Sequence, residues 1–338
     1  MKEPTAVSSH RPVPARLMER IVEIATRAPS VHNTQPWRWR ATGHTLELYA
    51  DPAYLLPETD PEGRNLTISC GAALHHAQVA AGALGWAAEV VRLPDPDQPD
   101  LLARLDLSPA APPAAAVEAL DALDRRATDR RRFTAWPVPE ERLAHLARIA
   151  NEWGARAVPL TDDSERFIAE RLVLRAAAHQ RTNRAAMREQ RQWQDRSAAD
   201  GVPSAVLPGP AGLRGAHLHR FESGTGGLLS AAGDTELEAS DGLLILFDTN
   251  NDTRAWLRAG EGLSALWLAA TAGGLSVVPL TQVIEVPETR LAMQSEVLGG
   301  LAHPFILVRI GWQSIGRDEL ARTPRRPVAE VLDTVRRR

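Results

Sequence analysis

The sequence predicts an α+β fold in which two similar halves of one chain each pack helices against strands. Three observations predict it. The 338 residues exceed the length at which a single hydrophobic core usually keeps growing. Apolar residues alternate between helix-like and strand-like spacing along the chain. A helix followed by a strand also recurs in the two parts of the sequence.

The first half is assigned to residues 1–115. A helix is predicted where Leu17, Ile21, Ala25 and Ala28 recur at helical spacing, and it must end before Pro29 because a residue preceding proline avoids the α region. A loop, PSVHNTQPWRW, follows. Residues 67–85 are expected to form an apolar helix ending at glycine, with strands AAEVVRL and LLARLDL after it.

The second half is assigned to residues 116–338. A short helix from Ala116 leads to the segment RRATDRRRF, and a proline-started helix and charged helices over residues 163–196 follow. Residues 196–233 are rich in Gly, Pro, Ser and Ala and are interpreted as a lid. Strands are predicted at GLLILFD and LSVVPL, with a helix over 253–273 between them.

An internal repeat is found on comparing the segment of residues 64–91 with the segment of residues 252–279. At a shift of 189 positions Gly71 matches Gly260 and Gly85 matches Gly274, and in both copies an apolar helix ends at glycine and runs into a strand. Two alanine-rich helices share composition whatever their ancestry. The repeat alone therefore leaves chance similarity open.

Composition places the chain in an ordinary class. Its hydrophobic share is 44% and its charged share 24%, near the averages of soluble globular proteins. No run of about 18 apolar residues is present, and Met1–Pro14 lacks the layout of a signal peptide. We expect a cytoplasmic protein that binds neither membrane nor nucleic acid. The single cysteine, Cys70, excludes an internal disulfide and is expected to be a small buried residue.

Two segments carry candidate binding residues. Ser30, Asn33 and Gln35 place short polar side chains on a proline-bounded loop, where they could bind the edge of a planar heterocycle or simply satisfy the backbone of a turn. In RRATDRRRF, Arg126, Thr128 and Arg130 alternate, and such groups suit a phosphate. The segment could instead be an exposed basic linker. Further arginines near the C-terminus could close the same anion site: Arg322, Arg325 and Arg326.

The PSVHNTQPWRW loop, the RRATDRRRF segment and a strand motif near the C-terminus together resemble the nitroreductase superfamily of FMN-dependent oxidoreductases. APSVHNTQPW at residues 28–37 and HPFILVRIGW at residues 303–312 match the family's A-P-S-x-x-N-x-Q-P-W loop and its P-x-x-L-V-R-I-G strand. The first half has the loop but no preceding arginine segment, whereas the second has the arginine segment but no such loop. The chain therefore resembles the Acg-type branch, in which a duplicated chain forms a pseudo-dimer with a central mixed sheet, flanking helices and a lid.

The resemblance implies one FMN held by both halves in a monomeric chain. It implies contacts of Pro29, Ser30, Asn33 and Gln35 with the ring or ribityl chain, and of backbone groups at Pro279, Leu280 and Thr281 with the ring. It implies a phosphate held by Arg126, Thr128, Arg130 and one of Arg325 or Arg326. Thr128 stands where the family usually has serine, one place off the common spacing to the phenylalanine.

Two functions fit this reading. In the first, the flavin carries the chemistry, accepting hydride from NAD(P)H and reducing a small nitro or quinone acceptor, so no catalytic side chain is required. In the second, the lid covers the flavin and the protein stores it. A third reading, a metal-dependent hydrolase, depends on His75 with His76 and on His217 with His219. Neighbouring helical histidines point apart, and no acidic partner stands at i+4.

Overall fold

The computed structural model describes residues 13–130, 133–207, 240–313 and 322–335. The first half contains α1 (Ala15–Ala25), η1 (Val31–Asn33), β1 (Trp37–Thr42), β2 (Thr45–Ala50), η2 (Pro52–Tyr54), α2 (Arg64–Ala83), β3 (Trp86–Arg92) and β4 (Leu101–Pro109). The rest contains α3 (Ala116–Arg125), α4 (Glu140–Glu152), β5 (Arg156–Pro159), α5 (Asp163–Thr182), α6 (Arg184–Gln192), η3 (Ser204–Val206), β6 (Gly242–Asp248), α7 (Thr253–Ala272), β7 (Leu275–Leu280), α8 (Gln282–Glu285), α9 (Pro287–Ala292), a π-helical turn (Met293–Val297), β8 (His303–Trp312), α10 (Val328–Val331) and β9 (Leu332–Thr334).

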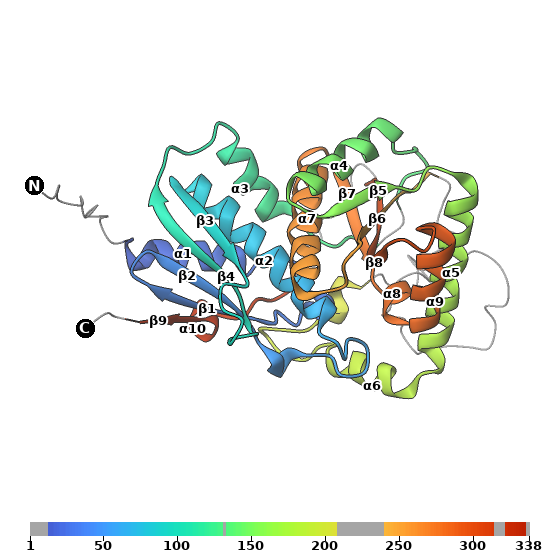
Figure 1. Ribbon diagram of the computed structural model, residues 1–338, viewed down its shortest axis with the longest axis horizontal. Coiled ribbons are helices and arrows are strands. Elements are labelled where there is room, and N and C mark those ends of the chain that lie inside the picture. Colours follow the sequence, from blue (N-terminus) through green and yellow to red (C-terminus); the bar gives the residue numbers. More distant parts are fainter. Residues whose placement is uncertain (1–12, 131–132, 208–239, 314–321, 336–338) are drawn as a thin grey trace, which may run out of the picture.

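The α+β class is confirmed, but the prediction of one central mixed sheet is wrong. The strands form two sheets, one in the order β3-β4-β2-β1-β9 and one in the order β5-β6-β8-β7. The first is mixed only because β9 runs parallel to β1, and the second is antiparallel throughout. In Figure 1 the sheets lie on opposite sides of the central helices α2 and α7. Each half pairs its own strands, so helices occupy the middle of the molecule.

The two sheets repeat one arrangement. β3-β4-β2-β1 of the first corresponds to β7-β8-β6-β5 of the second, and the three pairings within each set are antiparallel. In both halves the long helix, α2 or α7, precedes the edge strand β3 or β7. The second half differs by its insertions, α5 and α6 between β5 and β6, and α8 and α9 between β7 and β8.

The helices α2 and α7 cross at equivalent glycines. A Cβ on Gly71 would lie 2.1 Å from the carbonyl oxygen of Leu257, and a Cβ on Gly260 would lie 2.0 Å from that of Ile68. These four residues are two pairs related by the 189-residue shift of the repeat. Gly71 lies against Leu257, and Gly260 lies against Ile68, the counterpart of Leu257. The two contacts are therefore equivalent, as at a two-fold interface.

The two sheets are packed in different hydrophobic cores, and the first core also takes in Leu257 and Leu268 of α7. The first core joins α1, α2 and the first sheet around the fully buried Trp37 and Trp39, which anchor the end of the predicted loop, and Cys70 is buried in it as expected. This core also takes Leu123 from α3 and Val331 from α10. The boundary between residues 115 and 116 stays a prediction. Among the described residues, no helix combines the length and apolar character needed to span a bilayer.

The segment predicted as a lid is described only in part. Residues 199–201 lie against the first half, where the Gly201 backbone N–H donates to the Asn33 carbonyl at 3.4 Å and the Gln35 side-chain amide donates to the Ala199 carbonyl at 2.8 Å. The carboxylate of Glu189, just before this segment, accepts hydrogen bonds from the amides of Glu58 and Thr59 at 2.9 and 3.1 Å. Residues 208–233 lie outside the described residues.

Candidate functional site

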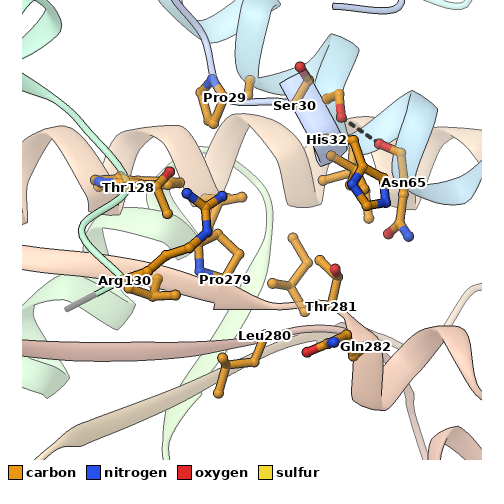
Figure 2. Close-up of a pocket in the computed structure, with 18 residues that line it drawn as sticks. Pro29, Ser30, His32, Asn65, Thr128, Arg130, Pro279, Leu280, Thr281 and Gln282 are labelled. Atoms are coloured by element: carbon orange, nitrogen blue, oxygen red, sulfur yellow. Dashed lines mark hydrogen bonds between the residues drawn. The ribbon is translucent and has the colours of Figure 1, made fainter. Parts of the chain in front are cut away.

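A pocket with an open mouth lies between the two halves. Figure 2 shows Pro29, Ser30 and His32 on one side and Pro279, Leu280 and Thr281 on the opposite side. The lining residues come from the loop before β1, from α2, from the segment after α3, from α7 and from the strands β7 and β8: Pro29, Ser30, Val31, His32, Asn65, Ile68, Ser69, Ala72, Thr128, Arg130, Leu263, Trp267, Val278, Pro279, Leu280, Thr281, Gln282 and Ile306.

The loop before β1 has an unusual backbone. His32, Asn33 and Gln35 have φ values of 52°, 55° and 51°, in the left-handed region that residues with a Cβ seldom adopt. The backbone N–H of Gln35 donates to Ser30 Oγ at 3.0 Å, which closes the loop on itself. Such a conformation persists only where the surroundings impose it, and it is often found beside ligands.

Asn33 and Gln35 do not line the pocket. The Asn33 amide donates to the carbonyl oxygens of Gly201 at 2.9 Å and Pro324 at 3.0 Å. The side-chain Nε2 of Gln35 donates to the Ala199 carbonyl at 2.8 Å, and its Oε1 accepts from the backbone N–H of Arg326 at 2.8 Å. Both side chains therefore tie two distant segments to the loop.

Two residues of the arginine segment line the pocket, and a third lies behind the lining. Thr128 and Arg130 line one end of the pocket (Figure 2). Arg126 lies behind the lining, with its guanidinium 4.8 Å from the ring centroid of Trp267 and its Nη2 donating to the Arg27 carbonyl at 3.0 Å. Since Trp267 itself lines the pocket, Arg126 is one side chain away from it.

Arg126, which is buried, and Arg325, which is half-buried, form a cationic cluster. Among the described residues, Nε and Nη1 of Arg126 and Nε of Arg325 are buried with no hydrogen-bond partner. Burial and the charges of Arg325 and Arg27 lower the pKa of Arg126 to about 9, and burial and Arg27 lower that of Arg325 to about 10. Buried cations with unused N–H groups call for an anion.

The other C-terminal arginines lie apart from this cluster. Arg326 stacks on Tyr54, with its guanidinium 4.2 Å from the ring centroid, and lies 3.8 Å from the Asp51 carboxylate. Arg322 is exposed and pairs with Asp124 at 2.7 Å. Arg325 is instead held by Asn33 Oδ1 at 3.0 Å and by the Arg27 carbonyl at 3.1 Å. Of these three, Arg325 is the one placed to bind an anion with Arg126.

Several residues that line the pocket are not predicted by the sequence motifs. Asn65 and Ser69 lie on α2, and Trp267 lies on α7. Polar residues in a nearly apolar helix are a usable signal, since Asn65 and Ser69 are both buried. His32 occupies a variable position of the loop motif, and only its conformation reveals it.

Of the histidines considered for a metal site, the structure describes His75 and His76, whose ring centroids lie 6.4 Å apart. His75 is buried and bonded to Ser264 Oγ at 2.8 Å, its counterpart in the repeat, and its ring packs edge-on against Trp153. Burial lowers the pKa of His75 to about 3. His217 and His219 lie outside the described residues. Within the described part of the chain, no group of three or more His, Cys, Asp or Glu side chains could hold a metal ion.

Comparison with known sequences places the chain among nitroreductases. A profile of the nitroreductase family matches residues 9–58. The Mycobacterium tuberculosis protein named putative NAD(P)H nitroreductase Rv3131 is 40% identical over 337 residues, covering 98% of this chain and 95% of the relative. The protein named putative NAD(P)H nitroreductase acg from the same organism is 32% identical over 318 residues, covering 92% and 93%.

A solved structure shows a more distant similarity. The FMN-dependent nitroreductase NfnB of Mycobacterium smegmatis, in complex with NADPH, is 18% identical and covers 65% of this chain and 99% of its own, with a TM-score of 0.40.

Proposed function

The chain belongs to the nitroreductase family, and we propose that it binds one FMN in the pocket between its halves and acts as an NAD(P)H-dependent oxidoreductase. The observation that carries the proposal is the cluster of Arg126 and Arg325 near that pocket, whose guanidinium groups have buried N–H donors without a partner. A phosphate would satisfy these donors and offset the mutual repulsion of the cations. The donor set therefore fits a phosphorylated cofactor.

The pocket lining suits the remainder of FMN. Thr128 and Arg130 lie at one end, while Pro29, Ser30 and the segment Pro279–Thr281 face each other across the middle (Figure 2). Apolar walls with a few polar groups suit a planar heterocycle. When bound, FMN supplies the hydride chemistry, accepting hydride from NAD(P)H and passing electrons to a nitro or quinone acceptor. The side chains bind and orient the ring, so none is assigned a catalytic role.

The composite character of the site follows from the origin that we propose for the chain, a fused dimer. The common strand order of the sheets and the equivalent glycines at the α2–α7 crossing support this origin. A symmetric interface satisfied within one chain leaves no need for a partner subunit. We therefore expect a monomer of 36.8 kDa, to be checked by size-exclusion chromatography with light scattering.

The decisive experiment compares FMN with riboflavin, which lacks the phosphate. We expect the wild-type protein to bind FMN at least tenfold more tightly, since each charge-assisted contact contributes about 1.5–3 kcal/mol. Replacing Arg126 and Arg130 together by alanine should remove the preference for FMN and leave the affinity for riboflavin nearly unchanged. Equal affinity of the wild-type protein for both flavins would contradict the proposal.

Storage of FMN is the second candidate. The observation that favours it is the packing of residues 199–201 on the loop that carries Pro29 and Ser30, through the amides of Asn33 and Gln35. Anaerobic addition of NADH or NADPH separates the two functions. Bleaching of the flavin band at about 450 nm within seconds indicates a reductase, whereas no bleaching over minutes indicates storage.

A further inference from the structure

A hydrogen-bond relay ends at the pocket, at the end away from Arg130. It starts at the carboxylate of Glu285, on α8. Its Oε1 accepts a hydrogen bond from Asn65 Nδ2 at 3.2 Å, and its Oε2 accepts one from Gln180 Nε2 at 2.9 Å. Oε1 of Gln180 in turn accepts from Gln282 Nε2 at 2.8 Å. Asn65 and Gln282 line the pocket, whereas Glu285 and Gln180 stand behind them.

The carboxylate fixes the direction of every bond in this relay. An ionised carboxylate only accepts, so Asn65 and Gln180 must both turn their NH₂ groups toward Glu285. Oε1 of Gln180 is then the acceptor for Gln282. The groups left over are Oδ1 of Asn65 and Oε1 of Gln282, both on buried side chains that line the pocket. This end of the pocket therefore offers two carbonyl oxygens.

We propose that Glu285 is a positioning residue that, directly and through Gln180, holds these two acceptors toward the ligand and thereby selects a ring with an imide or amide N–H. The proposal rests on FMN binding and deepens it. An oxidised flavin ring has a single N–H, at N3 between two carbonyl groups. Asn65 and Gln282 lie across the pocket from Thr128 and Arg130 (Figure 2), so an imide edge and an anionic end fit opposite ends.

The test uses the full chain without reductant and measures dissociation constants from the quenching of flavin fluorescence. The ligands are FMN and its N3-methyl derivative, which lacks the donor. The wild-type protein should bind the methyl derivative about ten- to hundredfold more weakly, since buried acceptors are left unpaired. The methyl group also adds bulk, but this effect is independent of Glu285. The informative quantity is therefore the ratio of the dissociation constant of the N3-methyl derivative to that of FMN, compared between variants.

Glu285→Gln should lower this ratio at least about fivefold. A glutamine at this position offers one acceptor and one donor group, so one of the two neighbouring amides must turn. Gln180→Leu should lower it less, because it cuts only the branch to Gln282. Glu288→Gln is the matched control, since Glu288 lies three residues away, is exposed and pairs with Arg175 at 2.9 Å. Its ratio should equal that of the wild-type protein.

The outcomes separate this proposal from the one on which it rests. Failure of the wild-type protein to bind FMN at all would refute both. Tight FMN binding with an unchanged ratio in Glu285→Gln and Gln180→Leu would refute the relay alone, as would a wild-type ratio near one. Thermal unfolding of each ligand-free variant confirms that it is folded. If Glu285→Gln does not fold, the ratio of Gln180→Leu decides.

Discussion

Replacing Arg126 by methionine should stabilise the ligand-free protein and weaken its hold on FMN. Burial and the neighbouring cations lower the pKa of Arg126 to about 9. At ~1.4 kcal/mol per pH unit this corresponds to about 4–5 kcal/mol of destabilisation of the charged side chain in the folded state. Methionine removes this cost and keeps a long apolar stem against Trp267.

The substitution also removes favourable contacts. The hydrogen bond from Nη2 to the Arg27 carbonyl contributes about 1 kcal/mol, and the stacking on Trp267 about 1–2 kcal/mol. The expected net gain in the free energy of unfolding is therefore about 2 kcal/mol in the absence of ligand. With FMN in excess the order should reverse, because tight binding stabilises the wild-type protein by mass action and the variant has lost a phosphate contact.

Urea unfolding at neutral pH, with and without FMN, measures both effects. Arg125→Met is the matched control, because Arg125 is exposed, pairs with Asp121 at the surface at 2.9 Å and donates one hydrogen bond to the Thr271 carbonyl at 3.1 Å, so it should lower stability by about 1 kcal/mol. A ligand-free Arg126→Met protein that is less stable than the wild type would refute the reasoning. It would mean that the cluster is satisfied without an anion.

Three further predictions follow from the packing and the charges. In the same urea assay, Gly71→Ala and Gly260→Ala should each destabilise the chain by about 3 kcal/mol or more, and by similar amounts, because each new Cβ meets a backbone carbonyl of the other helix. Gly82→Ala is the control, because Gly82 is on the same helix as Gly71 and a Cβ there has its nearest neighbour at 3.9 Å, and it should be neutral or stabilising. Burial raises the pKa of Asp60 to about 6, above its unfolded value of about 3.9. The resulting penalty is complete above pH 6 and disappears toward pH 4, so the wild-type protein should gain up to about 2–3 kcal/mol relative to Asp60→Asn between pH 7 and pH 4, and a constant difference would contradict this. Glu189→Gln should detach α6 from the first half by weakening its contacts with Glu58 and Thr59, detectable as faster hydrogen exchange over residues 184–192, and unchanged exchange would count against it.

The sequence predicts the pocket where recognition depends on a local motif. Pro29 and Ser30 are found in the lining, as are Thr128, Arg130 and the segment Pro279–Thr281. Strand and helix positions are also close to those observed, because period and punctuation by glycine and proline are local signals. The outcome for Asn33 and Gln35 could not be predicted, since their partners at residues 199–201 and 324–326 are distant in the sequence.

The arrangement of the sheets and the depth of Arg126 also depend on tertiary structure. A strand's own pattern does not tell which other strand it joins, so LLARLDL and GLLILFD are equally compatible with one sheet or with two. An arginine in a run of arginines reads as exposed, and only the proximity of Trp267 and Arg27 explains why Arg126 is buried. Glu285 and Gln180 belong to no motif, because they act on pocket residues and not on the ligand.

The repeat also explains why a chain with two similar halves would keep one flavin site. The 189-residue shift carries Ala72, Trp267, Thr281 and Ser69 of the pocket onto Glu261, Gln78, Arg92 and Arg258. These counterparts contact one another. The fully buried carboxylate of Glu261 accepts from Arg92 Nε and Nη2 at 2.7 and 2.6 Å and from Gln78 at 2.8 Å, and Arg258 lies 3.6 Å from it. A small side chain on α2 corresponds to a carboxylate on α7, and a threonine after β7 corresponds to an arginine ending β3. An ion pair thus stands at the counterpart of the position proposed for the flavin ring, and removing one partner would leave a buried charge unpaired. The absence of the loop motif from the second half and the filling of the counterpart position are therefore two independent features of the chain that support the proposed single composite site.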